Sequence, residues 1–318
     1  MTKWVGRRGA LGFAKEATRG TAVAPTYWLP YESLDFDDKV EKQIQQSAFG
    51  VIADSDANYN VNKYAEGSFT AHLEDKAIGL ILSNVIGTAP TSAGSTNYTH
   101  TYPYTNTNQH QSLSIGLKTP NENKIMPLSM IDEFKITVEP NGFAMVECSV
   151  MSRGGKDWAT LTPAYNALGN KFLHQHLSFK VAANITGLAS ASAVSLKGLT
   201  FTIKKNVLKE YVAGTLAPED LLNQDMAVTG EFTLVNDDTV WRNYFLDGSY
   251  KAIEIRFTYG ANNYLYFQLP YCSFNSWELD GGLSDIKNQK LEFIAHYDAA
   301  NAQGQIHTAV LANQVSSY

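Results

Sequence analysis

A short motif occurs twice in this chain of 318 residues, at a spacing that implies two copies of one unit. Residues 66–70 (EGSFT) are matched 163 positions later by residues 229–233 (TGEFT). Each motif follows a segment of alternating apolar residues, 33–39 in the first case and 198–204 in the second. Similar features recurring at one spacing indicate a repeated structural unit. We therefore predict two tandem units of the same fold.

Both copies of the motif lead into a stretch with helical spacing. Glu74 and Asp75 precede apolar residues three and four positions apart, and Asp237 and Asp238 do the same in the second copy. Acidic residues at such a start favour the positive end of a helix and can cap it. Glycine follows each stretch, at positions 87 and 248, where a helix commonly stops. We expect one short helix in each unit.

The remaining pattern in each copy is that of β-strands separated by turns. Four strands follow each helix, and the expected order is strand, long loop, strand, helix and four strands, twice. This predicts a mainly β protein with two tandem β-sandwich or barrel units. The expected divisions are an extended N-terminal arm (1–26), a first unit (27–153), a linker (154–176) and a second unit with a C-terminal extension (177–318). Coincidence within a β-rich composition is the alternative to a repeat.

Charge and cysteine content narrow the function classes. The net charge is −6, and proteins that grip nucleic acid phosphates usually show a basic face instead. Two cysteines, Cys148 and Cys272, are too few for a disulfide framework or a zinc site, so we expect buried free thiols. The N-terminus lacks a signal-peptide pattern, and the longest apolar stretch, 77–85, is too short for a spanning helix. We expect a soluble protein made in the cytoplasm.

No motif in the sequence predicts catalysis. Residues 54–60 (DSDANYN) resemble the start of a calcium loop, but Tyr59 and Ala65 stand where that loop needs glycine and glutamate. His174 and His176 have no Cys, Asp or Glu group beside them to complete a metal site. We therefore predict no enzyme activity, no catalytic residues, no cofactor and no metal. A β-sandwich hydrolase whose carboxylates meet only in space is the remaining enzymatic alternative.

The first 90 residues carry a resemblance to a known family. Gly9, Glu16, Gly20, Thr21 and Pro25 lie in a glycine-rich segment that leads into the first strand. This segment resembles the N-terminal signature of tail tube proteins, the major tail proteins of bacteriophages with long, non-contractile tails. Residues 50–53, the segment 64–69 and the acid-started helix 74–87 are also similar to that family.

The resemblance implies an assembly as well as a fold. Tail tube subunits carry a β-sandwich flanked by a helix, and their inner sheets join edge to edge into a closed ring. Single-unit members form hexameric rings. Two fused units imply a homotrimeric ring with pseudo-sixfold symmetry, and a ring of six chains is the alternative. Edge strands that are a hazard in a monomer serve as a means of assembly in such a ring.

The implied function is that of a structural virion protein. Stacked rings would form the hollow tail tube through which DNA is ejected into the host. The implied partners are other copies of the chain, the tape measure protein, and the tail terminator and distal tail proteins. DNA is expected only in transit, and no membrane partner is expected. A carbohydrate- or receptor-binding β-sandwich and a secretion-system-type tube protein are the alternatives.

Two sets of residues are the candidate contact sites. The expected arm offers aromatic and basic anchors for the next ring, Trp4, Arg7, Arg8 and Phe13, and the long loop 39–63 is expected to reach that ring too. Strand alternation turns a second, largely acidic set away from the core. An acidic lumen would repel phosphates and let DNA slide, whereas an ordinary solvated face is the alternative. The lumen-facing candidates are Glu133, Lys135, Glu139, Glu147, Glu231, Glu278 and Glu292.

Overall fold

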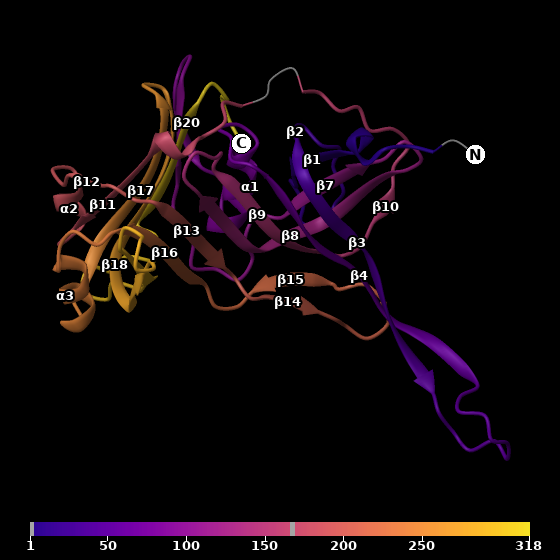
Figure 1. The fold of residues 1–318 in the computed structure, drawn as a ribbon. Coiled ribbons are helices and arrows are strands. Elements are labelled where there is room, and N and C mark those ends of the chain that lie inside the picture. The colour runs from indigo at the N-terminus through magenta and orange to yellow at the C-terminus, as the bar shows by residue number, and fades with distance from the viewer. Residues whose placement is uncertain (1–2, 166–168) are drawn as a thin grey trace.

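Antiparallel strand pairing organises nearly the whole chain (Figure 1). The computed structural model describes residues 3–165 and 169–318. Residues 1–2 of the predicted arm and 166–168 of the predicted linker lie outside the described residues. Among those described, eighteen strands join one hydrogen-bonded network and two more form a separate hairpin. The prediction of a mainly β fold is therefore confirmed.

The first half of the chain forms a ladder of seven strands. In spatial order these are β3 (Tyr31–Gln45), β4 (Ala57–His72), β9 (Met145–Ser152), β8 (Asn123–Val138), β7 (Leu113–Lys118), β1 (Ala10–Lys15) and β2 (Tyr27–Leu29). The short strand β10 (Lys156–Asp157) also pairs with β8, and β5 (Thr91–Gly94) forms a hairpin with β6 (Tyr98–Tyr102).

The second half also contains a ladder of seven strands. In spatial order these are β13 (Gly198–Lys204), β16 (Ala227–Val235), β19 (Asn288–Ala295), β18 (Asn263–Asp280), β17 (Lys251–Gly260), β11 (Leu177–Ala182) and β12 (Ala193–Val194). The separate hairpin is β14 (Val207–Glu210) with β15 (Asp220–Asn223). The halves join where β8 pairs with β13, and where β20 (Thr308–Asn313) lies between β18 and β6.

Each half has one long strand that contains a proline. Proline normally interrupts a strand, yet β8 runs through Pro127 and β18 runs through Pro270. Leu128 has a φ of 54°, and this local irregularity lets β8 turn from β7 to β9 without ending. The long strands therefore connect one side of each ladder to the other.

The helices are short. They are α1 (Ile78–Ile86), α2 (Ile185–Leu188), α3 (Val240–Leu246) and the 3-10 turns η1 (Gly6–Arg8) and η2 (His174–His176). The predicted signals hold at both longer helices. A Glu74 carboxylate oxygen accepts the Ala77 backbone N–H before α1, and an Asp238 oxygen accepts the Val240 N–H before α3. Gly87 and Gly248 follow with φ of 122° and 60°, so both predicted stops are confirmed.

One hydrophobic core runs through both halves. Phe13 and Phe69 pack with their ring centroids 5.5 Å apart in the first half, and Phe179 and Phe232 pack at 4.9 Å in the second. Every residue of α1 is buried, because the helix lies inside this core rather than on its surface. Cys148 and Cys272 are free, buried thiols as predicted, and burial raises the pKa of both.

The N-terminal segment differs from the predicted extended arm. Strand β1 lies between β2 and β7, and Phe13 within it is fully buried. The alternation that exposes one face of a strand is absent here, since five of the six residues of β1 are buried. The prediction that Phe13 contacts another ring is therefore wrong for this chain's fold. The segment before β1 is exposed, as are single positions between β1 and β2 such as Thr18 and Thr26.

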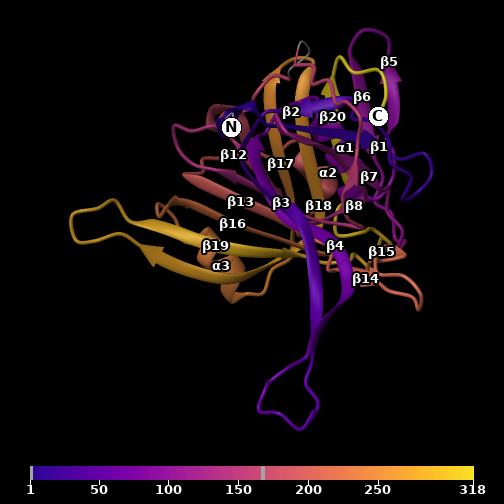
Figure 2. The ribbon, with the colours of Figure 1, turned by 90° about the vertical axis from the view of Figure 1, so that its right-hand side faces the viewer.

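A long hairpin leaves the body of the molecule. Strands β3 and β4 stay paired from Tyr31 with Ala71 out to Gln45 with Ala57, far beyond the other strands (Figures 1 and 2). The predicted loop 39–63 is therefore mostly paired strand, with a short tip at 46–56. We call the part from 40 to 63 the projecting hairpin.

Candidate assembly surfaces

The ladders of the two halves join into one sheet of eight strands. Its order is β3, β4, β9, β8, β13, β16, β19 and β18. One face is buried and carries Phe69, Phe134, Phe201, Phe232 and Phe293. The other face is polar, because neighbouring positions alternate between the two sides.

Six of the seven predicted lumen residues lie on this polar face. Residues directly opposite one another in paired strands share a face. Lys135 lies opposite Glu147 and Thr202, and Glu231 lies opposite Thr200 and Glu292. Glu133 and Glu278 join the same face by alternation and by pairing, the latter opposite Lys290. Glu139 lies just beyond the end of β8, in an exposed turn.

Two lysines moderate the negative charge of the polar face. Lys135 Nζ lies 3.2 Å from a Glu147 oxygen, and Lys290 Nζ lies 2.9 Å from a Glu231 oxygen. The hydrogen bond to Glu231 raises the pKa of Lys290. Glu231 and Glu292 stand directly opposite each other, and the positive charge of Lys290 reduces the repulsion between these two carboxylates. The face keeps an excess of carboxylates.

The two ends of the eight-stranded sheet have free edges within the described part of the chain. Strand β3 pairs with β4 on one side only. The last part of β18, from Ser276 to Asp280, pairs with β19 on one side only. Leu279 within it is 53% exposed, although its opposite position on β19 is the buried Gln289. Unpaired N–H and C=O groups in such edges are available to another strand.

The contact between β8 and β13 shows how two such edges fit together. These strands pair over six residues, with Phe134 opposite Ile203, Ile136 opposite Phe201 and Val138 opposite Leu199. All six side chains are buried. The pairing therefore joins the backbones of the two halves into one sheet, and the buried side chains continue the hydrophobic core from one half into the other.

The exposed N-terminal segment carries the other predicted contact residues. Trp4, Arg7 and Arg8 are exposed, and the two arginines form the short turn η1. The side chains of Trp4, Arg7 and Arg8 therefore lie outside the core and are free for an external contact.

Glu16 is an important residue whose role the sequence pattern did not reveal. Its buried carboxylate accepts hydrogen bonds from the Ser112 and Ser114 hydroxyls and from the Gly20 and Leu128 backbone N–H groups, at 2.6 to 2.8 Å. A carboxylate with four donors is well satisfied despite burial. It fixes the turn after β1 against β7 and β8, which explains why a glutamate stands in the N-terminal motif.

No geometry for metal chemistry is present in residues 3–165 and 169–318. No group of three or more His, Cys, Asp or Glu side chains there is placed to hold a metal ion. His176 accepts the Leu173 backbone N–H with Nδ1 and serves the turn in which it lies. In the same residues, no helix is long and apolar enough to cross a membrane.

A sheet with one buried face, one polar face and two free edges offers unpaired backbone N–H and C=O groups to a further strand. The class defined by the fold is an antiparallel β protein whose main sheet is open at both ends. The family described as phage tail tube protein matches residues 6–305. The chain belongs to this family. A search of curated proteins found no match.

Family membership decides between the classes of function considered above. The protein is a structural, non-enzymatic component of the virion that forms the tube of a phage tail. Tail tube proteins self-assemble into rings. The predictions of a tail tube protein and of a non-enzymatic function are confirmed.

Proposed function

We propose that three chains close into one pseudo-sixfold ring of a long, non-contractile tail, and that each chain supplies two tandem tail-tube units. The observation that carries this proposal is the repeated order of strand pairing. The first ladder, β3-β4-β9-β8-β7-β1-β2, corresponds strand by strand to the second, β13-β16-β19-β18-β17-β11-β12.

Irregularities at matching positions support the same repeat. The register of β8 against β9 slips at Asp132, and the register of β18 against β19 slips at Asn275. These residues are 143 positions apart, as are Pro127 and Pro270 within the same strands. Bulges are inherited features of a fold, so coincident bulges support a common origin for the two ladders.

The proposed units keep the sequence-based bounds with one change. The first unit is 27–153, the linker 154–176 and the second unit 177–318. Strand β1 pairs with β7 as β11 pairs with β17, which supports extending the first unit back to residue 10. The arm then shortens to residues 1–9, with Trp4, Arg7 and Arg8 as its contacts to the next ring.

Ring closure follows if the free edges repeat the contact between β8 and β13. Strand β18 of one chain corresponds to β8, and β3 of the next chain corresponds to β13. Transferring the observed register places Leu279 opposite Phe36 and Glu278 opposite Asp37. Leu279 would become buried there, as Ile136 is at the corresponding position. Three copies close six units with every edge paired.

The polar face of the sheet would then line the lumen. Its excess of carboxylates repels DNA phosphates, so DNA passes without the counterion release that drives tight binding. The proposed lumen residues are Glu133, Lys135, Glu139, Glu147, Glu231, Glu278 and Glu292. We place the tape measure protein inside the tube, and the tail terminator and distal tail proteins at its ends.

A disulfide between neighbouring chains tests this ring. In assembled tubes of the Asp37→Cys/Glu278→Cys variant, the two positions would lie about 5 Å apart at the Cα atoms, a separation that suits a disulfide. Both residues are exposed in the single chain, and the native cysteines are buried. Oxidation should produce a ladder on a denaturing gel that ends at three chains.

The matched control moves one cysteine out of register. Asp35→Cys/Glu278→Cys shifts the partner by two residues and places the Cα atoms roughly 8 Å apart, beyond disulfide reach. Equal cross-linking of the two variants would contradict the register. A ladder that ends at six chains would retain edge pairing and replace the trimer by a hexamer. Threefold class averages with six lobes in negative-stain images would agree with the trimer.

A further inference from the structure

The tip of the projecting hairpin exposes several apolar side chains to solvent. Among its exposed side chains, Phe49 is 45% exposed, Val51 is 68% exposed and Ile52 is fully exposed. Strands β3 and β4 carry this tip about 20 Å beyond the body, counting six residues of strand from Val40 to Gln45. A group of apolar side chains held away from any core is typical of a contact surface.

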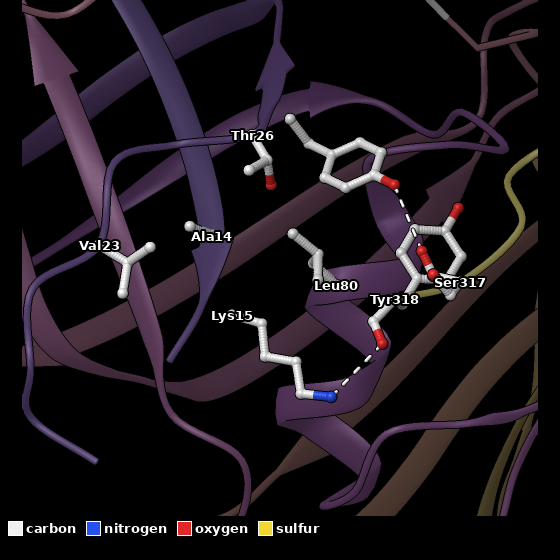
Figure 3. Close-up of a pocket in the computed structure, with 8 residues that line it drawn as sticks. Ala14, Lys15, Val23, Thr26, Leu80, Ser317 and Tyr318 are labelled. Carbon is white, nitrogen blue, oxygen red and sulfur yellow. Dashed lines mark hydrogen bonds between the residues drawn. The ribbon is translucent and has the colours of Figure 1, made fainter. Parts of the chain in front are cut away.

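The opposite end of the molecule contains two adjoining hollows. The first, with a volume of about 310 Å³, is lined largely by apolar side chains, among them Ala14, Val23, Leu80 and the Tyr318 ring (Figure 3). The second, about 420 Å³, shares Thr26 and Tyr27 with the first. Both views of the ribbon place strand β2 and the C-terminal segment, which border the hollows, far from the tip of the hairpin (Figures 1 and 2).

The walls of the hollows are preorganised. Tyr318 donates a hydrogen bond from its hydroxyl to the Lys76 carbonyl at 2.6 Å and accepts one from Asn313 at 2.7 Å. Its ring lies on Gly79 of α1, where a Cβ atom would come within 2.1 Å of the ring. The apolar wall of the first hollow therefore does not have to be ordered when a partner binds.

Charges at the two ends are complementary. Asp54 and Asp56 follow the apolar tip, and both are exposed. Lys76 lines the second hollow, and Lys15 lines the first, where its Nζ also donates to the main-chain oxygen of Tyr318 at 3.4 Å (Figure 3). The one acidic side chain in the lining, Glu74, already accepts the backbone N–H groups of Ala77 and Gly169. The hairpin tip therefore has apolar side chains followed by acids, and each hollow at the opposite end has a lysine in its lining.

We propose that the hairpin tip of one chain inserts into these hollows on a second copy of the chain in the adjacent ring, with Phe49 and Ile52 as the inserted side chains. A contact between opposite ends of identical molecules is heterologous and does not close, so it repeats ring after ring along a tube. This inference rests on the proposed function, since it requires stacked rings. It adds the surface that receives the hairpin.

Two variants distinguish stacking from ring closure. Phe49→Ser/Ile52→Ser should raise the protein concentration needed for tube formation more than tenfold, measured by sedimentation and negative-stain images. Val240→Ser/Leu246→Ser removes exposed apolar side chains from α3 and should leave that concentration unchanged. Normal tubes at unchanged concentration from the tip variant would overturn the inference.

The cysteine pair across the ring junction serves as the internal control. When Asp37→Cys and Glu278→Cys are added to the tip variant, covalent trimers should still form while tubes do not. This result separates a failure of stacking from a failure of the ring. Loss of both trimers and tubes, with the protein folded, would assign the tip to ring closure and overturn the inference.

A second cross-link tests the receiving surface directly. Ile52→Cys/Thr26→Cys, treated with a short bifunctional maleimide in assembled tubes, should link chains of adjacent rings. Thr26 is exposed and borders both hollows. Ile52→Cys/Ser190→Cys, with the second cysteine on an exposed position after α2, should not cross-link. Equal yields from the two pairs would overturn the assignment of the hollows.

Discussion

Lys205 offers a quantitative test of the fold because it is buried without a carboxylate partner. The side chain is 1% exposed, and Nζ donates to the Asn84 carbonyl at 2.8 Å and to Asn84 Oδ1 at 3.1 Å. No carboxylate of the described residues forms an ion pair with it. Burial lowers the pKa of Lys205 from 10.5 to about 7; the nearby Arg19 acts in the same direction, and Asp132 opposes it.

The direction of the pH effect follows from this lowered pKa. In the unfolded chain Lys205 stays protonated up to its ordinary pKa, whereas in the folded chain it loses its proton near pH 7. The penalty for burying a charged lysine is therefore fully present at low pH and is relieved as the pH rises. Between about pH 7 and about pH 8.5 the unfolded state binds more protons, and the free energy of unfolding should rise by about 1.6 kcal/mol from this group.

The perturbation is Lys205→Met, which removes the titrating group and keeps most of the side-chain volume. The free energy of unfolding of the unassembled chain would be measured by urea denaturation at both pH values. The wild type should gain about 1.6 kcal/mol over this range, and the variant should gain almost nothing. Burial and Lys205 lower the pKa of His110 to about 4, so its folded form stays neutral throughout.

The neighbouring lysine provides the control. Lys204 points to the polar face of β13 and is exposed, so Lys204→Met makes the same change in charge without touching the core. Its pH dependence should match that of the wild type. If Lys205→Met retains the full gain between the two pH values, or if Lys204→Met loses it, the assignment of the effect to a buried lysine is refuted.

Four further variants test the N-terminus and the polar face. Glu16→Ala leaves buried donors without an acceptor and should lower the free energy of unfolding by about 3 kcal/mol or more in urea titrations. Deleting residues 3–8 should leave the circular dichroism spectrum and melting temperature unchanged but reduce tube yield in negative-stain images. Deleting residues 3–15 also removes β1 and should unfold the chain. Glu231→Lys/Glu292→Lys should give tubes that bind DNA in a salt-dependent way in a gel-shift assay.

Local signals in the sequence were sufficient for the parts of the fold that depend on neighbouring residues. The acids before α1 and α3 and the glycines after them predicted both helices and both ends correctly. The alternation along β8, β9, β13, β16 and β19 predicted which side chains share the polar face. These signals work because a helix cap or a strand face is decided within a few residues.

Features that depend on distant pairing were not predictable in this way. The segment around Phe13 reads as a glycine-rich arm, but β7, a hundred residues later, supplies the partner that buries it. The same limit applies to β20, whose pairing with β6 joins the C-terminal strand to the first half of the chain. Proline normally interrupts a strand, so the continuity of β8 and β18 through Pro127 and Pro270 depends on local irregularity that no periodicity reveals.

The two halves differ most at the projecting hairpin, and this difference has consequences for a ring of three chains. The hairpin β14–β15 has the same pairing register as the outer part of β3–β4: Val207 opposite Asn223 corresponds to Lys42 opposite Asn60. Yet β14–β15 folds back onto the first half, where Val207 and Leu221 pack against Leu128 and Met130.

The projecting hairpin lacks the residues for such folding back. Lys42 and Asn58 stand at the positions of Val207 and Leu221. In the proposed ring, these polar side chains would not form an apolar contact with β18 of the next chain. In the proposed ring, three hairpins would therefore project toward the next ring and three would lie folded against their own chains. The wall would approach sixfold symmetry because its strand ladders are equivalent, whereas stacking would be threefold because only one hairpin in each chain reaches beyond the ring.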